Sequence, residues 1–217
     1  MRNPITAMAF LVLAALFAPP RHSAAQELVD RIAARIESDI ILLSDIRGLS
    51  RYQTFLDGKP QTDEEILNRL IDQWIVRNEA NTSRFPQPSE EDVDRSIERL
   101  KRSFASPEAY DTRKKQTALS DEEIRRFVSA QLYLSNYLDS RFRPVIQIKE
   151  AEIEEFYRSR VVPRAESRGH APPTQENARD FIHEALVQRA INEQADRWLK
   201  ESRTRVRVES LLNEKTP

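Results

Sequence analysis

Three acidic clusters are the segments whose composition could most readily perform acid–base chemistry. They lie at residues 62–66 (TDEEI), 89–93 (SEEDV) and 120–124 (SDEEI). Neighbouring carboxylates can act as a general acid and a general base. Each cluster, however, follows a Ser or Thr and precedes an apolar residue, as at a helix start, where the hydroxyl caps free amide groups and the acids meet the positive end of the helix dipole. The clusters therefore predict three helix starts and not a catalytic site.

Other catalytic chemistries lack the residues that they require. The chain has no Cys, so it has no thiol nucleophile, no disulfide and no thiolate-bound metal. With three Gly in all, it contains no G-x-S-x-G elbow and no phosphate-binding glycine loop. His183 precedes Glu184 but has no second ligand at the spacing of a known metal set. We therefore expect a protein that is not an enzyme, with no catalytic residues, no metal site and no cofactor.

Aromatic side chains offer a different kind of chemistry, which is the binding of unfolded polypeptide. An unfolded chain presents apolar side chains without fixed geometry, and a shallow groove with aromatic walls binds such segments weakly and broadly. Seven Tyr and Phe residues are too many for the core of one small helical domain, which indicates that some line a groove, although the alternative for each is a place in the core. These candidate peptide-binding residues are Tyr52, Phe55, Phe85, Phe104, Tyr110, Tyr133 and Tyr137.

The composition favours helices as the elements that position these residues. Charged residues make up 32% of the 217 residues and Gly is rare, so helix propensity is high and turns are few. Apolar residues follow each capped cluster at helical spacing, while Pro86, Pro88 and Pro144 separate or end the predicted helices. The net charge of −1 gives no electrostatic footprint for nucleic acid, so we expect no nucleic-acid partner.

Strand patterns occur at both ends of the chain. Residues 28–43 hold two β-branched runs around a polar turn, which predicts a hairpin. Ser44 and Asp45 then predict the cap of a helix that runs to Leu56 and is stopped by residues 57–60 (DGKP). Residues 204–209 alternate polar and apolar side chains, which predicts a strand with no partner nearby in the sequence. Because an isolated hairpin is marginally stable, we expect this strand to join it, giving a mainly α fold with a small three-stranded antiparallel sheet.

The region before the last strand predicts a linker and a long helix. Residues 161–173 contain three Pro, Gly169 and His170, which is the composition of a flexible linker. Thr174 predicts the cap of a helix that continues to about Ser202.

Residues 1–25 have the pattern of a secretory signal. Arg2 precedes an apolar run at residues 7–18 that is too short to span a bilayer comfortably, and residues 23–25 (SAA) fit a cleavage site after Ala25. An uncleaved anchor is the alternative. No Cys follows the run, which excludes a lipoprotein. We expect the mature chain in the periplasm, without stable membrane insertion.

The order of these segments resembles the SurA/PpiC-type periplasmic chaperones. In that family V-D-x-I-A-x-x-V, a turn and I-x-x-S-D lead into the first helix, as residues 28–36 (LVDRIAARI) and 40–45 (IILLSD) do here. The later matches are a long helix ending near residues 141–143 (RFR), a short helix at 150–157 (EAEIEEFY), and closing segments at 195–200 (ADRWLK) and 206–208 (VRV). The resemblance covers essentially the whole mature chain.

The resemblance implies a helical chaperone core at residues 26–160 that is completed by the helix and strand of residues 174–217. In much of the family a parvulin-type prolyl isomerase domain of about a hundred residues follows the short helix, whereas here residues 161–173 alone hold that position. The resemblance therefore implies an ATP-independent holdase without isomerase activity. Its implied partners are unfolded polypeptides, above all outer-membrane β-barrel precursors.

Two other functions stay open at this point. A divergent peptidyl-prolyl cis-trans isomerase would make the protein an enzyme. An envelope assembly module would instead bind one folded partner or a second copy of the chain, and the long C-terminal helix is compatible with a swapped homodimer.

Overall fold

The computed structural model describes residues 30–212, which form helices and one small sheet. The elements in chain order are β1 (Ile32–Ile36), β2 (Asp39–Leu42), α1 (Leu43–Asp57), α2 (Asp63–Thr82), α3 (Glu90–Ser103), α4 (Pro107–Gln116), α5 (Asp121–Phe142), η1 (Arg143–Val145), α6 (Glu150–Phe156), η2 (Tyr157–Val161), α7 (Val162–Glu166), α8 (Gln175–Arg203) and β3 (Val208–Ser210). The predicted mainly α fold is confirmed. The predicted signal at residues 1–25 lies outside the described residues. Within residues 30–212 no helix is both long and apolar enough to cross a bilayer.

The sheet joins the two ends of the described chain in the strand order β2-β1-β3. Both pairings are antiparallel, and Ile36 of β1 lies opposite Val208 of β3. The amide of Leu211 donates to the carbonyl of Ala33 at 2.8 Å, so the pairing continues past the end of β3. The predicted three-stranded sheet is confirmed, but the last strand begins at Val208 and is shorter than the predicted residues 204–209.

Three helices begin at the acidic clusters, as predicted. The side-chain oxygens of Thr62, Ser89 and Ser120 each accept a hydrogen bond from the backbone amide three residues further on, at the starts of α2, α3 and α5. In α2 and α5 a Glu carboxylate also accepts from the capping residue's own amide, which completes a capping box. The acids of these clusters therefore have a structural role at helix starts.

Helix α1 begins earlier than predicted and ends where predicted. The carboxylate of Asp45 accepts a hydrogen bond from the amide of Leu42 at 2.8 Å, and the helix begins at Leu43. The predicted start at Ser44 is therefore wrong, because the acid caps the residue before the helix. At the other end Gly58 has φ +75°, a backbone conformation that favours glycine, and it stops the helix.

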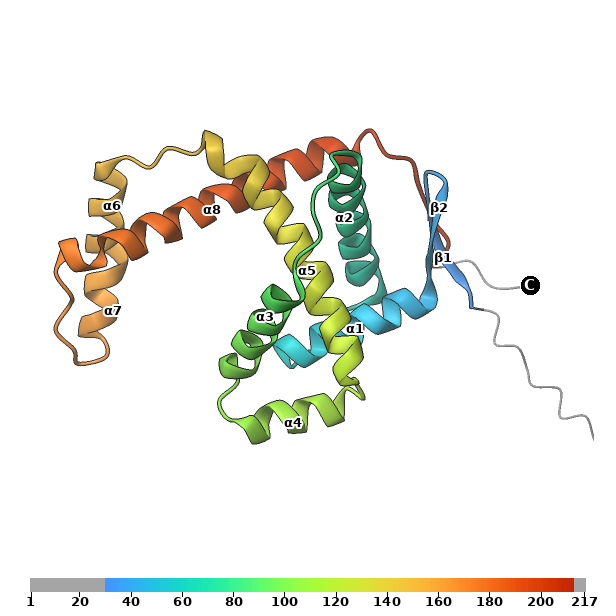
Figure 1. Cartoon of the computed structure of the whole chain (residues 1–217), viewed down its shortest axis with the longest axis horizontal. Coiled ribbons are helices and arrows are strands. Elements are labelled where there is room, and N and C mark those ends of the chain that lie inside the picture. Colours follow the sequence, from blue (N-terminus) through green and yellow to red (C-terminus); the bar gives the residue numbers. More distant parts are fainter. Residues whose placement is uncertain (1–29, 213–217) are drawn as a thin grey trace, which may run out of the picture.

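The helices form two lobes that share α8 (Figure 1). We define the arm as residues 148–186 and the body as the rest of the described chain. Helices α1 to α5 and the sheet build the body, with one large buried cluster and a smaller one between α2 and α5. The arm has a separate small core made by Ile153, Ala178, Ile182 and Leu186. Helix α8 has 29 residues and spans about 44 Å, so it carries the arm away from the body.

The predicted linker is helical over its first part. Helix α6 continues through the π-helical turn η2 into α7, and residues 167–174 form a turn and an extended return to α8. Pro163 has no amide hydrogen and cannot continue a regular α-helical hydrogen-bond pattern, and the π turn ends two residues before it. The hydroxyl of Tyr157 donates to the carbonyl of Pro173 at 2.7 Å and ties the return segment to the helix. The linker prediction is therefore wrong for residues 161–166.

Two arginines fix α8 to the body. The guanidinium of Arg143 donates to the carboxylate of Asp139 on α5 at 2.8 Å and to that of Glu184 on α8 at 2.7 Å. The hydrogen bonds from Arg143 lower the pKa of the Glu184 carboxyl. Near the other end of α8, Arg203 donates to Asp72 on α2 at 2.6 Å. Exposed ion pairs contribute little to stability, so their main effect is to set the direction of α8.

Candidate functional site

Four of the seven candidate aromatic residues pack together in the body. The ring of Phe55 lies 5.1 Å from that of Phe104 and 5.4 Å from that of Tyr110, measured between ring centroids. Tyr52, one turn earlier on α1, stacks on Phe127 of α5 at 4.7 Å. These contacts join α1, the end of α3, α4 and α5 in the large body cluster. The aromatic spacing on α1 thus serves helix packing.

The other three candidate aromatic residues form a second group between α2 and α5. The ring of Phe85 lies 5.9 Å from that of Tyr133 and 5.6 Å from that of Tyr137. The hydroxyl of Tyr133 donates to the side-chain oxygen of Asn81 at 3.0 Å, which satisfies its polar end. Because this group belongs to the smaller body cluster, the structure does not bring the seven residues together in one groove.

Burial corrects the role expected for most of these aromatic residues. Tyr52, Phe55, Tyr110, Tyr133 and Tyr137 are each 6% exposed or less, so they are core residues. The other two, Phe85 and Phe104, are half-buried against the same clusters. The core takes five of the seven, because the rings pack on one another in two clusters, and it leaves the other two partly exposed. The aromatic surface that this set offers to a ligand is therefore small.

Two of these residues line a pocket of about 510 Å³ between α3 and α4, which we call the α3–α4 pocket. Its lining combines Phe104 and Tyr110 with the charged residues Glu98, Lys101 and Asp111, among others. Lys101 donates to Glu98 at 2.8 Å, which raises the pKa of the Lys101 ammonium group. An apolar wall beside charges of both signs suits a peptide segment better than a purely apolar ligand.

A second groove, of about 470 Å³, lies on the arm between α7, the return segment and the start of α8; we call it the arm groove. It combines three arginines with apolar side chains. Phe181 is 71% exposed, which is unusual for a side chain of this size. The lining residues are Phe156, Arg160, Val161, Arg164, Ala165, Arg168, His170, Ala171, Pro173 and Phe181.

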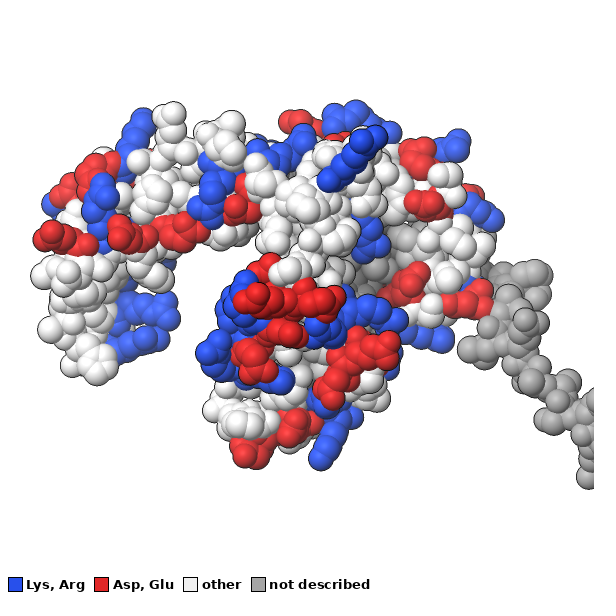
Figure 2. Space-filling model, in the orientation of Figure 1, with Lys and Arg blue, Asp and Glu red and all other residues white. Residues whose placement is uncertain are grey.

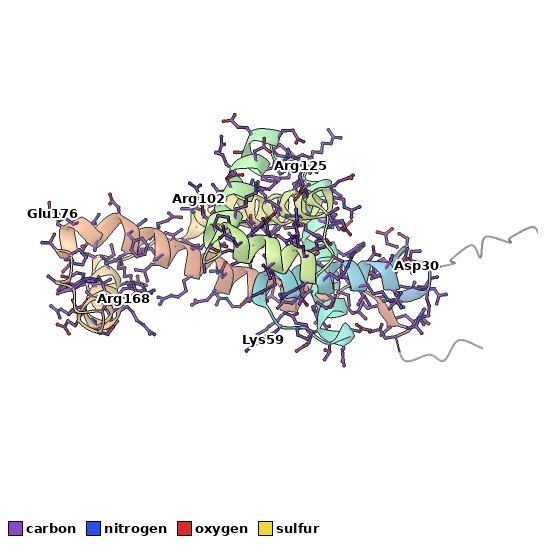
Figure 3. All side chains as sticks on the ribbon, turned by 90° about the horizontal axis from the view of Figure 1, so that it is seen from below. Asp30, Lys59, Arg102, Arg125, Arg168 and Glu176 are labelled. Atoms are coloured by element: carbon purple, nitrogen blue, oxygen red, sulfur yellow. The ribbon has the colours of Figure 1, made fainter. Side chains whose placement is uncertain are left out.

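The space between arm and body is open. Figure 2 shows the molecule hollowed between the arm and the α3–α4 end of the body, with Lys or Arg side chains on the arm where it borders the hollow. Helix α8 passes along one side of the hollow and connects the two lobes (Figure 1). Figure 3 places Arg102, which lines the α3–α4 pocket, on the part of the body nearest the arm, and Arg168 of the arm groove on the arm. The residues that line the two grooves therefore lie on separate lobes of the molecule.

The three arginines and Phe181 of the arm groove were not among the residues that the sequence nominated. Arg160, Arg164 and Arg168 recur at a four-residue interval, which is the signature of one helix face. Pro and Gly in the same segment favour a linker interpretation, and that interpretation hides the helical spacing. Phe181 lies on a helix that the sequence does predict. Its exposure depends on which other elements pack against that helix, and the sequence alone does not show this.

The buried hydroxyl of Tyr52 makes the stability of the body pH-dependent. Burial raises the pKa of Tyr52 to about 12, whereas a tyrosine in an unfolded chain titrates near 10. The folded state therefore resists ionisation, so the free energy of unfolding is unaffected below about pH 10 and falls as the pH rises from about 10 to about 12. We expect Tyr52→Phe to lessen this alkaline loss, as measured by urea denaturation at successive pH values.

A control for that experiment is Phe127→Leu, which alters the ring stacked on Tyr52 without removing a hydroxyl. This variant should keep the alkaline slope of the original protein. An unchanged slope in Tyr52→Phe would contradict the placement of Tyr52 in the core.

Among residues 30–212, no group of three His, Asp or Glu side chains is arranged to hold a metal ion. Comparison with models of known protein families and with curated proteins gives no match.

Proposed function

We propose that the protein is an ATP-independent, periplasmic holdase chaperone that binds unfolded polypeptides and has no isomerase activity of its own. The observation that carries the proposal is the open hollow between arm and body, with a groove of several hundred Å³ on each lobe. Two separated, shallow grooves suit a ligand that is long and lacks a fixed shape. They do not suit a compact small molecule, which needs a single enclosed site.

The shallowness of the grooves is compatible with capture and release without nucleotide. Shielding about 400 Å² of apolar client surface corresponds to about 10 kcal/mol of gross stabilisation. Most of this is offset by the loss of association entropy and chain entropy, which leaves micromolar-scale binding. Charged side chains around both grooves keep such a complex soluble.

The proposed location and clients follow from the sequence. The signal-like pattern at residues 1–25 supports export, and the resemblance to SurA/PpiC-type chaperones supports precursors of outer-membrane β-barrel proteins as clients. The short stretch between α7 and α8, where many relatives of that type carry a parvulin domain, supports a chaperone without isomerase activity.

The direct test is suppression of aggregation. A urea-denatured outer-membrane β-barrel protein is diluted into buffer without ATP, and light scattering is followed with the purified protein in several-fold excess. We expect scattering to fall in proportion to the protein added, while an equal mass of an inert protein of similar net charge has no effect. No protection at several-fold excess would contradict the proposal.

Two further measurements separate this function from the alternatives. A protease-coupled proline isomerisation assay should give no turnover above background, and clear turnover would instead support a peptidyl-prolyl isomerase. A native pull-down should recover many unfolded clients. Recovery of one stoichiometric folded partner, or of a second copy of the chain alone, would support an assembly module.

A further inference from the structure

The arm groove has a basic side made of three arginines. Arg160 lies in η2, Arg164 in α7 and Arg168 in the turn that follows, so a four-residue interval separates each from the next. All three are exposed and all three line the groove. Glu176 and Arg168 mark the end of the arm in Figure 3, and the groove lies beside this end.

The three arginines of this side form no ion pair within the described residues. None of the residues that line the groove is Asp or Glu. Within residues 30–212, the neighbouring Arg158 forms an ion pair with Glu154, whereas no carboxylate pairs with any of the three groove arginines. The adjoining pocket shares Phe156 and Arg160 with the groove and adds the carboxylates of Glu152 and Glu155, whereas Arg164 and Arg168 line the arm groove alone. The arm groove is thus complementary to a ligand with negative charge.

The other side of the arm groove is apolar and includes an uncovered aromatic ring. Phe181 of α8 is the most exposed large apolar side chain among residues 30–212. Phe156 and Val161 line the same groove and are half-buried. An exposed aromatic beside arginines favours a ligand that carries apolar groups as well as negative charge.

The spacing of the arginines matches one class of ligand. Arg160 and Arg164 lie in one continuous helical stretch, where residues four apart are separated by about 6 Å along the axis, and Arg168 lies in the turn just beyond it. Alternate residues of an extended polypeptide, which point to the same side, are separated by about 6.6 Å. Carboxylates at alternate positions of an extended segment can therefore meet successive arginines, while the residues between them face the apolar side of the groove.

We propose that the arm groove binds extended client segments in which Asp or Glu alternates with aromatic or branched apolar residues. This inference rests on the proposed function, because it names the client chemistry that one of the two grooves selects. An anionic membrane surface would offer similar charge. The groove is concave, however, and a concave surface accepts a chain better than it inserts into a flat bilayer.

The test uses labelled peptides of about seven residues, which span about 23 Å when extended. One peptide alternates Glu with Phe, a second has the same composition with the Glu and Phe residues in separate blocks, and a third has Lys in place of Glu. By fluorescence anisotropy we expect the alternating acidic peptide to bind at least about tenfold more tightly than the basic one, and more tightly than the block peptide, with weakening as salt rises. Equal affinity for all three would overturn the proposal.

Charge reversal locates the binding site. The triple variant Arg160→Glu/Arg164→Glu/Arg168→Glu should weaken binding of the alternating peptide at least about tenfold. The matched control reverses three exposed bases outside the groove, at Lys59, Lys115 and Arg197, and it changes the net charge by the same amount. The control should retain more of the binding than the groove variant. Equal loss in both variants would overturn the proposal, because it would show a response to net charge alone.

A single substitution tests the groove in case the triple charge reversal misfolds the arm. Phe181→Ser changes an exposed side chain and should leave the circular dichroism spectrum unchanged while it weakens peptide binding several-fold. Unchanged binding in this variant would overturn the apolar part of the proposal. A parallel measurement uses vesicles that contain phosphatidylglycerol. Arginine-dependent binding to these vesicles in place of the peptide would also overturn the proposal.

Failure of this inference can be told apart from failure of the proposed function. If the unmodified protein suppresses aggregation but does not distinguish the peptides, the holdase function stands and the client preference is wrong. If it binds the alternating peptide through the arginines but protects no client, the groove assignment stands and the holdase function is wrong.

Discussion

Replacing Phe55 with alanine is expected to lower the free energy of unfolding by about 3–5 kcal/mol. Phe55 is fully buried, and its ring contacts those of Tyr52, Phe104 and Tyr110. Removing the ring leaves a cavity where α1, α3 and α4 meet, and aromatic neighbours that are anchored on three different elements cannot close it by small movements. A loss of this size is a large part of the total stability of a typical domain.

Urea denaturation monitored by circular dichroism measures this effect. Phe55→Leu is the conservative comparison, and it should cost less than half as much because it keeps most of the buried volume. Phe181→Ala is the matched control for the loss of a Phe ring, since Phe181 is exposed; it should change the free energy of unfolding by about 0.5 kcal/mol or less. Equal costs for Phe55→Ala and Phe181→Ala would contradict the assignment of Phe55 to the core.

The same variant links the core to the α3–α4 pocket. Phe104 and Tyr110 line that pocket and also pack on Phe55. A buried ring therefore holds in place two of the side chains that line this pocket. Two of the seven nominated residues, Phe104 and Tyr110, thus contribute to a pocket and to the aromatic cluster beneath it.

Local signals allowed most of the helices to be predicted. A hydroxyl, acids in the first turn and an apolar stripe are all contained within a few residues, so the starts of α2, α3 and α5 at Thr62, Ser89 and Ser120 could be identified without tertiary information. The meeting of the chain ends was predictable for a different reason. A strand pattern with no local partner must pair elsewhere, and the hairpin was the available partner.

Features that depend on contacts between distant residues could not be predicted. The burial of Phe55 requires Phe104 and Tyr110, which lie about fifty residues away in the sequence. The shortened β3 has a similar cause: Val206 alternates correctly for a strand, but it packs against the body core before the pairing begins. In both cases the sequence shows an apolar residue, and tertiary packing decides where it goes.

The arm shows how a composition rule can mislead. Pro163 and Gly169 are strong indicators of a loop when only composition is considered. A proline just inside the start of a helical turn is well tolerated, however, and Pro163 occupies such a place in α7 after the π turn. Once the helix continues through Pro163, the arginines fall at helical spacing and the arm groove exists.

Replacing Ile182 with alanine is expected to unfold the arm while the body stays folded. Ile182 is completely buried, and it packs in the small arm core with Ile153, Ala178 and Leu186. The loss of a buried isoleucine costs about 2–5 kcal/mol. A core of this size has few other contacts to absorb that loss, so we expect local opening of the arm in preference to global unfolding.

Hydrogen exchange followed by mass spectrometry measures the effect segment by segment. Amides of α6, α7 and the first half of α8 should lose protection in Ile182→Ala, whereas those of α1 and α5 should exchange as before. The matched control is Ile191→Ala, which removes the same atoms from a buried position on the same helix outside the arm core. The control should spare the arm and affect the body end of α8.

The same pair of variants tests whether the capture of clients needs both the arm and the body. If clients are held between arm and body, Ile182→Ala should lose most of its suppression of aggregation, because the arm groove requires a folded α7 and α8. Uniform loss of hydrogen-exchange protection over the whole chain would contradict the division into two lobes, since it would mean that α8 couples them into one cooperative unit. Full suppression of aggregation with an unfolded arm would contradict the role of the hollow, because the body alone would then be the client-binding element.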